Sequence, residues 1–292
     1  MDTIGLHIIG GWSGNLGRPR LVKLCDVSPE YVRQVRGQIG PEALIVVRWT
    51  GSNNCLHEGA RAWFECYQHE MRAMADANVA FEGPNEIPDG LAPLYARFEA
   101  ERLSLMHEAG LRSVVGNFSV GTPDLGVWAT YRPMLQAMQA GDLLGLHEYW
   151  IDTADINNRW HCGRWTIPEI AAIIGDTKIV ITECGRDMVE GKGRPGWRQT
   201  CGAATFLEDL RQYNALLEQH SNVLGATVFT VGGHGWGQFD ATPVWPSVVA
   251  GYANPQTYPG VSVPAPKPPE PSKPKPCADH PGAIWQGSPN YG

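Results

Sequence analysis

Two short runs of the sequence end in acidic residues where a carboxylate is costly to bury. They are Phe81-Glu82-Gly83-Pro84-Asn85-Glu86 and Ile181-Thr182-Glu183-Cys184-Gly185, and each continues an apolar stretch typical of a buried strand. A carboxylate buried without a partner is strongly unfavourable, so acids in such places indicate a functional site. A pair of carboxyl groups that face one another is the arrangement that hydrolysis of a glycosidic bond requires.

The elements that must position these acids are read from the hydrophobic pattern. Short apolar runs predict strands, and amphipathic stretches predict helices. The strands are expected at residues 3–10, 21–27, 43–49, 79–86, 112–120, 142–150, 177–183 and 223–231, and the helices at 28–40, 60–76, 91–109, 128–140, 167–174, 202–220 and 244–252. Eight strands, with a helix after each of them except the first, have the rhythm of a (β/α)₈ barrel.

A doubly wound open sheet would show the same alternation, but no Gly-x-Gly-x-x-Gly follows the first strand. We therefore predict an α/β fold, a (β/α)₈ TIM barrel, over residues 1–260. Residues 261–276 are proline-rich and predict an extended linker. Residues 277–292 are too few to fold alone, which indicates the stub of a following module that is covalently linked.

Composition excludes several classes of function. The net charge is −7 and no basic stripe is interleaved with aromatic residues, which argues against a nucleic-acid partner. No apolar run approaches the roughly 20 residues that a membrane helix needs. The amino terminus shows no basic region followed by an apolar one, so no signal peptide is predicted. We expect a monomer that acts outside the cell or at a cell wall.

The cysteines and histidines do not form a strong metal motif. Seven cysteines are an odd number, so complete internal pairing is excluded. Cys55, His57, Cys66 and His69 match no strong zinc template, and their structural interpretation is preferred. We predict no metal and no cofactor.

Barrel enzymes carry their functional residues at the carboxyl ends of the strands. Alternation along the fourth strand would place Glu82, Pro84 and Glu86 on one side, with Arg48 on the neighbouring strand as the partner of Glu82. The candidates for substrate binding at these strand ends are Trp12, Arg48, Trp49, Asn85, Asn117, His147, Tyr149 and Trp236. Each of the three tryptophans is equally well explained by packing.

Three of these motifs resemble those of the clan A glycoside hydrolases. Phe-Glu-Gly-Pro-Asn-Glu resembles their strand-four Asn-Glu motif, Ile-Thr-Glu-Cys-Gly their strand-seven motif, and His147-Glu148-Tyr149 their strand-six His-x-Tyr. The resemblance covers about residues 3–255. The chain departs from it at the end of strand eight, where Phe229-Thr230 replaces the usual tryptophan, and Trp236 follows later.

The resemblance implies a role for each residue. Glu86 would be the general acid/base and Glu183 the nucleophile. Asn85 would bind the sugar 2-hydroxyl, Tyr149 would donate to the nucleophile, and His147 would hold the acid or the substrate. We predict carboxyl groups about 5–5.5 Å apart and retention of anomeric configuration, because inversion needs about 6.5–9.5 Å.

Two alternatives stay open. A metal-dependent barrel would use His7, His147, His234, Glu86 and Glu183 around a divalent ion. A barrel without catalysis would only bind glycans.

The last residues carry a further resemblance. Trp285-Gln-Gly-Ser-Pro-Asn-Tyr-Gly292 resembles the start of amidase modules in phage-type cell-wall lysins. The resemblance to clan A implies a retaining glycoside hydrolase that cleaves a β-linked polysaccharide. The resemblance of the last residues implies an endolysin-like enzyme, in which the barrel would cut a peptidoglycan-like glycan of the cell wall.

Overall fold

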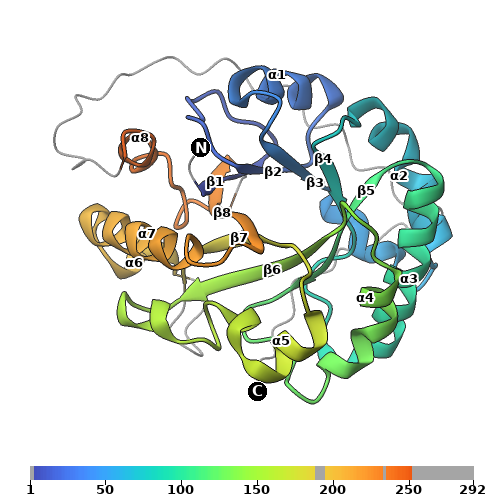
Figure 1. Ribbon diagram of the computed structural model, residues 1–292. Helices are drawn as coiled ribbons and strands as arrows, with labels where there is room; N and C mark the ends of the chain where they lie inside the picture. Colours follow the sequence, from blue (N-terminus) through green and yellow to red (C-terminus); the bar gives the residue numbers. More distant parts are fainter. Residues whose placement is uncertain (1–2, 188–194, 233–234, 252–292) are drawn as a thin grey trace.

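Eight parallel strands close into a barrel. The computed structural model describes residues 3–187, 195–232 and 235–251. Each strand pairs with its neighbours in the sequence, and the last pairs with the first (Figure 1). The strands are β1 (Ile4–Ile9), β2 (Leu21–Cys25), β3 (Leu44–Arg48), β4 (Val79–Glu82), β5 (Arg112–Phe118), β6 (Leu143–Trp150), β7 (Ile179–Arg186) and β8 (Val223–Gly232). The predicted TIM barrel is confirmed, and residues 261–292, predicted as linker and stub, lie outside the described residues.

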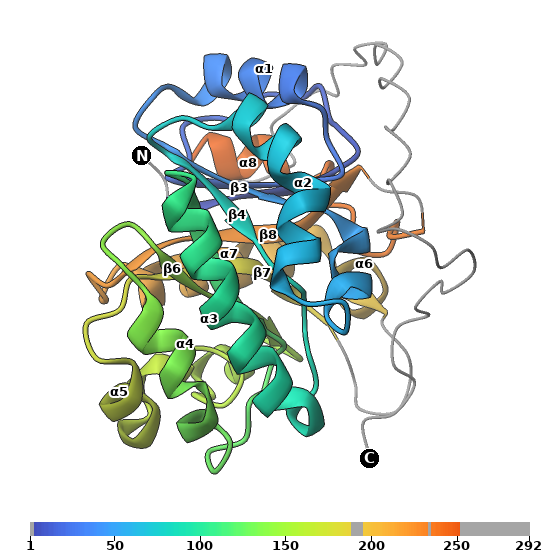
Figure 2. The same ribbon diagram turned by 90° about the vertical axis from the view of Figure 1, so that its right-hand side faces the viewer.

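Helices cover the outside of the barrel. They are α1 (Pro29–Ile39), α2 (Ala60–Met74), α3 (Ala92–Glu108), α4 (Arg132–Ala137), α5 (Pro168–Ile174), α6 (Gly196–Thr200), α7 (Ala203–Leu217) and α8 (Trp245–Val249). Figures 1 and 2 show α1 to α4 following one another around one side. The regular alternation of strands and helices is broken in two places. Residues 10–20, rich in glycine, form no helix, and α6 and α7 both lie between β7 and β8.

Local signals in the sequence explain where α1 begins and ends. The Ser28 side chain accepts a hydrogen bond from the backbone N–H of Tyr31, and Pro29 occupies the first position of the helix. Gly40 ends the helix with a φ of 83°, a conformation that favours glycine. No described helix is long and apolar enough to cross a membrane.

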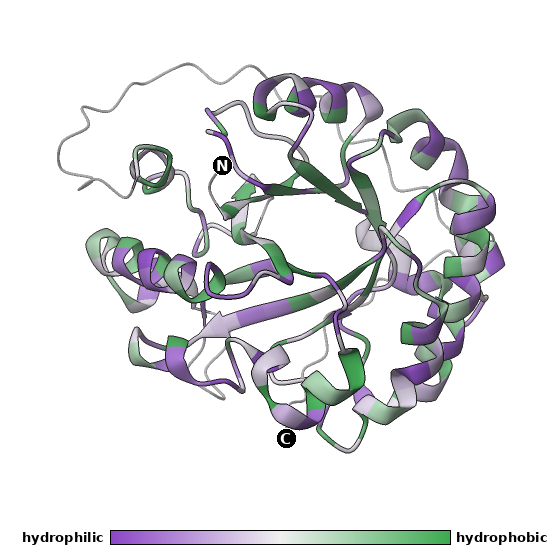
Figure 3. Cartoon of the chain, viewed as in Figure 1, coloured by the Kyte–Doolittle hydropathy of each residue, from purple (hydrophilic) through white to green (hydrophobic). Residues whose placement is uncertain are grey.

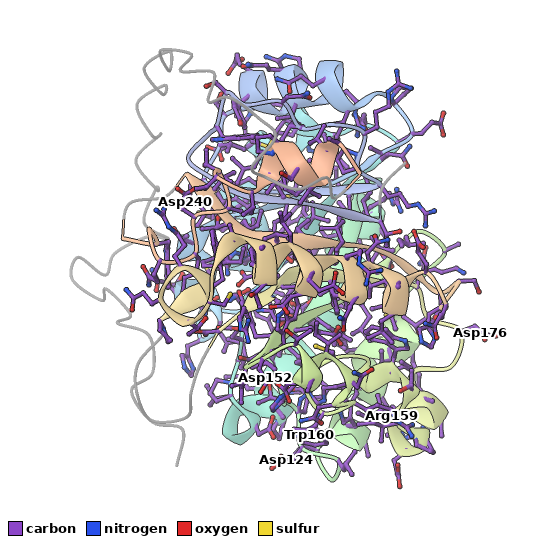
Figure 4. All side chains as sticks on the ribbon, turned by 90° about the vertical axis from the view of Figure 1, so that its left-hand side faces the viewer. Asp124, Asp152, Arg159, Trp160, Asp176 and Asp240 are labelled. Atoms are coloured by element: carbon purple, nitrogen blue, oxygen red, sulfur yellow. The ribbon has the colours of Figure 1, made fainter. Side chains whose placement is uncertain are left out.

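The interior of the barrel changes from apolar to polar along the strands. Its amino end is filled by Leu21, Leu44, Val46, Ala80, Val114, Leu143 and Val180. Two residues further along β2 and β4 the inward positions hold Lys23 and Glu82, both fully buried. In Figure 3 most strands are hydrophobic, whereas β6 has a hydrophilic stretch near its carboxyl end. Figure 4 shows Asp176, which precedes β7, and Asp240, which follows β8, at opposite ends of the barrel.

Strand β6 directs its polar residues to both of its faces. Glu148, between His147 and Tyr149, points outward and is buried beside α7. It accepts hydrogen bonds from the backbone N–H of Gly163, at 2.6 Å, and from the hydroxyl of Tyr213. Burial raises the pKa of Glu148 to about 7, although these hydrogen bonds act in the opposite direction.

Glu148 should make stability depend on pH. The folded protein keeps the carboxyl proton between pH 4.5 and about pH 7, where the unfolded chain has lost it. The unfolded state then binds fewer protons, so the free energy of unfolding should fall across this range, by about 3 kcal/mol in all, and level off above it. Urea denaturation at pH 5 and pH 7.5 measures the effect. Glu148→Gln should remove most of the difference, and an equal pH dependence in both proteins would contradict it.

Candidate active site

The pairing of β6 with β7 places Glu183 beside His147. Leu146 pairs with Ile181, but His147 pairs with Glu183. The register of the pairing therefore shifts by one residue at Thr182. Tyr149 lies two residues beyond His147 on the same face of β6. Its hydroxyl donates a hydrogen bond to Glu183 Oε2 at 3.0 Å. The two polar residues of β6 therefore meet the acid of β7 inside the carboxyl end of the barrel.

Glu86 is positioned by a loop and not by β4. We expected alternation along one strand to link Glu82 with Glu86, but β4 ends at Glu82. Glu86 has a φ of 52° and Asn117 a φ of 43°, conformations that are uncommon for residues other than glycine. The backbone N–H of Glu86 donates to the carbonyl of Asn117 at 3.0 Å. The amide side chain of Asn53 forms two hydrogen bonds with the backbone of Asn85, at 2.6 and 2.8 Å.

The two acids come together at His147. Its Nδ1 shares a hydrogen bond of 2.9 Å with Glu86 Oε1 and lies 3.7 Å from Glu183 Oε2. One oxygen of each carboxylate and one ring nitrogen of His147 all lie within 4.8 Å of one another. The Glu86 side chain is 22% exposed and that of Glu183 is 8% exposed. Acids that are far apart along the chain therefore share one site, with Glu86 nearer to solvent.

A buried lysine, which our sequence analysis missed, connects Glu183 to Glu82. Lys23 Nζ lies 2.8 Å from Glu82 Oε2 and donates a hydrogen bond to Glu183 Oε1 at 3.0 Å. Arg48, the partner that we predicted for Glu82, approaches it only to 3.9 Å through Nε. The signal was present in the sequence: in the buried strand β2, alternation from Leu21 points Lys23 into the barrel.

The surroundings of Glu183 keep it ionised. Burial alone would raise its pKa, but the charges of His147 and Lys23 lower it further than burial raises it. His7 and Arg48 act in the same direction, and the pKa of Glu183 lies well below its ordinary value.

His7 completes the ring of polar residues around this acid. Its Nδ1 lies 3.7 Å from Glu183 Oε1, and its side chain is fully buried. Burial lowers the pKa of His7, and the neighbouring Lys23 lowers it further. The imidazole of His7 and the ammonium of Lys23 therefore adjoin the same carboxylate oxygen.

Aromatic residues surround part of the site. The ring of Phe229 lies 5.1 Å from that of His7 and 6.4 Å from that of Tyr149. Trp236 packs edge-on against Phe229 at 5.1 Å, so the later tryptophan lies beside the residue at the usual tryptophan position. Trp12 follows β1 and is partly exposed; its backbone is held by the hydroxyl of Tyr31.

Other predicted residues are placed differently. Trp49 is buried, stacks on Tyr67 and donates a hydrogen bond to Glu70. Asn117 is fully buried and shapes the loop that carries Glu86. Asn85 Oδ1 is buried and accepts no hydrogen bond within the described part of the chain. His234 lies outside the described residues.

The chain resembles several solved structures in its fold. No protein-family model matches the chain, and the search of curated proteins found no significant match. A GH128 (subgroup I) endo-β-1,3-glucanase from Amycolatopsis mediterranei, in complex with laminaritriose, has a TM-score of 0.56 at 16% identity, covering 86% of this chain and 99% of that chain. The catalytic domain of a GH26 endo-β-1,4-mannanase from Bacillus sp. JAMB-750 has a TM-score of 0.54 at 12% identity, covering 87% and 86%.

A further solved structure agrees with these two. A GH128 (subgroup II) endo-β-1,3-glucanase from Sorangium cellulosum has a TM-score of 0.50 at 14% identity, covering 82% of this chain and 91% of that chain. These likenesses extend over most of the barrel.

Proposed function

We propose that this chain is a retaining glycoside hydrolase that cleaves a β-linked polysaccharide, with Glu86 as general acid/base and Glu183 as nucleophile. The observation that carries the proposal is the approach of the two acids, with one oxygen of each within 4.8 Å of the other. Retaining enzymes hold their carboxyl groups about 5–5.5 Å apart, whereas inverting enzymes leave room for a water at about 6.5–9.5 Å. The short approach favours retention.

The different surroundings of the two acids support the division of roles. Glu183 accepts hydrogen bonds from Lys23 and Tyr149 and is held as a carboxylate. Glu86 is more exposed and shares its hydrogen bond with the imidazole of His147. An ionised carboxylate suits attack on carbon, and a carboxyl group beside an imidazole suits proton transfer.

The reaction follows in two steps. In the first, Glu183 forms a bond to the anomeric carbon while the glycosidic bond breaks and Glu86 gives its proton to the departing oxygen. In the second, Glu86 accepts a proton from a water whose oxygen attacks the same carbon, and the ester bond to Glu183 breaks. Both acids return to their starting states, and two inversions give net retention.

Several neighbouring residues are proposed to bind the substrate. Asn85 Oδ1, buried and without a donor among the described residues, is suited to accept a hydrogen bond from the sugar 2-hydroxyl. Trp12 and Trp236 are partly exposed, and we assign them the role of packing against sugar rings. Arg48 and Asn117 are assigned to positioning, because they contact Glu82 and the Glu86 loop.

The similar structures guide the choice of substrate. They are endo-acting enzymes on β-1,3-glucan or β-1,4-mannan, and one of them holds laminaritriose. We propose a β-glucan or β-mannan cleaved within the chain. A peptidoglycan-like substrate stays a second proposal, which depends on the resemblance of residues 285–292 to cell-wall lysins.

The metal-dependent alternative fits the described residues less well. Glu86, His147 and Glu183 do offer three ligand atoms close together. Both oxygens of Glu183, however, already accept hydrogen bonds, one of them from the ammonium of Lys23. A cation so close would repel a divalent ion.

The test is a hydrolysis screen with an anomeric readout. The panel contains β-1,3-glucan, β-1,4-glucan, β-1,4-mannan and peptidoglycan, and NMR follows the first-formed anomer. We expect cleavage of one β-glycan to give the β-anomer first, with full activity in the presence of a chelator. The α-anomer first, loss of activity with the chelator, or binding without cleavage would each refute the proposal.

A further inference from the structure

We infer that Lys23 drives the second half of the reaction, by holding Glu183 Oε1 so that the carboxylate leaves readily from the glycosyl-enzyme, while Glu82 keeps the ammonium paired throughout. This inference depends on the proposed function. It assigns Lys23 as a positioning residue for Glu183.

Contacts and burial define the arrangement. Lys23 Nζ is 3.0 Å from Glu183 Oε1 and 2.8 Å from Glu82 Oε2. The side chains of Lys23 and Glu82 are 0% exposed. An ion pair so deeply buried costs more desolvation free energy than most pairs regain. Its place against the proposed nucleophile suggests that it serves the reaction.

The two oxygens of Glu183 have different surroundings. Oε1 is held by Lys23 from inside the barrel, whereas Oε2 faces Tyr149 and lies 3.7 Å from His147, which also contacts Glu86. Oε2 is therefore the oxygen that faces the second acid and attacks the anomeric carbon. Oε1 then becomes the carbonyl oxygen of the ester and keeps its hydrogen bond from Lys23.

The charge balance explains why two carboxylates face one ammonium. Before attack, Lys23 lies between two anions. In the ester, Glu183 is neutral, and Glu82 still compensates the charge of Lys23. The hydrogen bond to Oε1 polarises the ester and strengthens as negative charge returns to Glu183 during hydrolysis. Lys23 thus weakens Glu183 as a nucleophile but improves it as a leaving group.

The experiment compares the two steps in Lys23→Met, which keeps the length of the side chain and removes its charge. With a dinitrophenyl β-glycoside of the preferred sugar, whose leaving group needs no proton, stopped flow measures the phenolate. We expect a burst close to one equivalent, followed by turnover about 10- to 100-fold slower than in the wild type, the range for a lost hydrogen bond to a charged group. Intact-protein mass spectrometry should show the glycosyl-enzyme accumulating.

The pH profile gives a second readout that a purely structural role would not change. Loss of a cation beside Glu183 lets its pKa rise, so the acid limb of kcat/KM should move to higher pH in Lys23→Met. An unshifted limb, or slower turnover with neither burst nor accumulated intermediate, would overturn the inference.

Further variants separate mechanism from folding. Lys23→Met combined with Glu82→Gln removes the ammonium and its counter-charge together, so it should fold even if Lys23→Met does not, and should accumulate the same intermediate. Glu99→Gln is the matched control, because Glu99 and Arg102 form a fully buried ion pair in α3. It should lower thermal stability without a burst. If the wild type cleaves no glycan, the proposed function fails; if it cleaves with retention but Lys23→Met accumulates nothing, only this inference fails.

Discussion

Glu183→Gly should lose hydrolysis of its glycan almost completely, by roughly 10⁴-fold or more, as expected when the residue that forms the covalent bond is removed. The physical reason is that Glu183 is the carboxylate held ionised beside the proposed reaction centre, with its pKa lowered by His147 and Lys23 in spite of burial. A water molecule in the space left by the side chain would need a base to take its proton before it could attack the anomeric carbon. The measurement is kcat/KM on the preferred glycan and on an aryl β-glycoside.

Adding azide tests whether the loss of activity in Glu183→Gly is due to the missing nucleophile. In Glu183→Gly the space left by the side chain admits an azide ion, which attacks the anomeric carbon in a single displacement. We expect azide to restore cleavage of the aryl glycoside and to give the α-glycosyl azide. Glu148→Gln is the control, because it removes a buried carboxylate on the outer face of β6 and should keep full activity at a pH where it is folded. Normal hydrolysis by Glu183→Gly, or a β-azide product, would be incompatible with Glu183 as nucleophile.

Glu86→Ala should give a different pattern, which depends on the leaving group. A general acid contributes about 10²- to 10⁴-fold, so the natural glycan should be cleaved slower by that factor. A dinitrophenyl glycoside needs no proton for departure, so its first step should be nearly as fast as in the wild type. The second step also uses Glu86, as a base, and the glycosyl-enzyme should therefore accumulate.

The azide product distinguishes the two acids. In Glu86→Ala the nucleophile Glu183 is intact, and azide attacks the glycosyl-enzyme where water would. Two displacements give the β-glycosyl azide, the opposite anomer to that expected from Glu183→Gly. Equal losses on the glycan and on the dinitrophenyl glycoside would contradict the role of Glu86 as acid. His147→Ala should weaken the same proton transfer less, because it removes only the hydrogen-bond partner of Glu86.

The barrel and the pair of acids could be predicted because their signals are local. Buried parallel strands appear as continuous apolar runs, and caps such as Ser28 mark the ends of helices. A carboxylate at the end of such a run can be recognised from the sequence alone. The same reasoning would have found Lys23, since a cation within an apolar strand is equally unusual.

Other features required the folded structure. Whether a tryptophan packs or binds depends on its neighbours, and Trp49 proved to be stacked on Tyr67 within the core. Arg48 and Lys23 both lie on strands near Glu82, and only distances showed that Lys23 is the closer ion. The irregular pairing that places Glu183 beside His147 depends on how two strands meet, which no single strand encodes.

The sequence by itself determined that eight strands, most of them followed by helices, would form a barrel, and that Glu86 and Glu183 would lie toward its carboxyl end, because hydrophobic periodicity and the handedness of βαβ units act along the chain. Only the tertiary structure decided how the acids meet. A left-handed turn held by Asn117 aims Glu86, and closure of the barrel brings Lys23 from β2 to Glu183 on β7. Closure joins residues that are remote in sequence, and the electrostatic field at Glu183 is the sum of those remote charges.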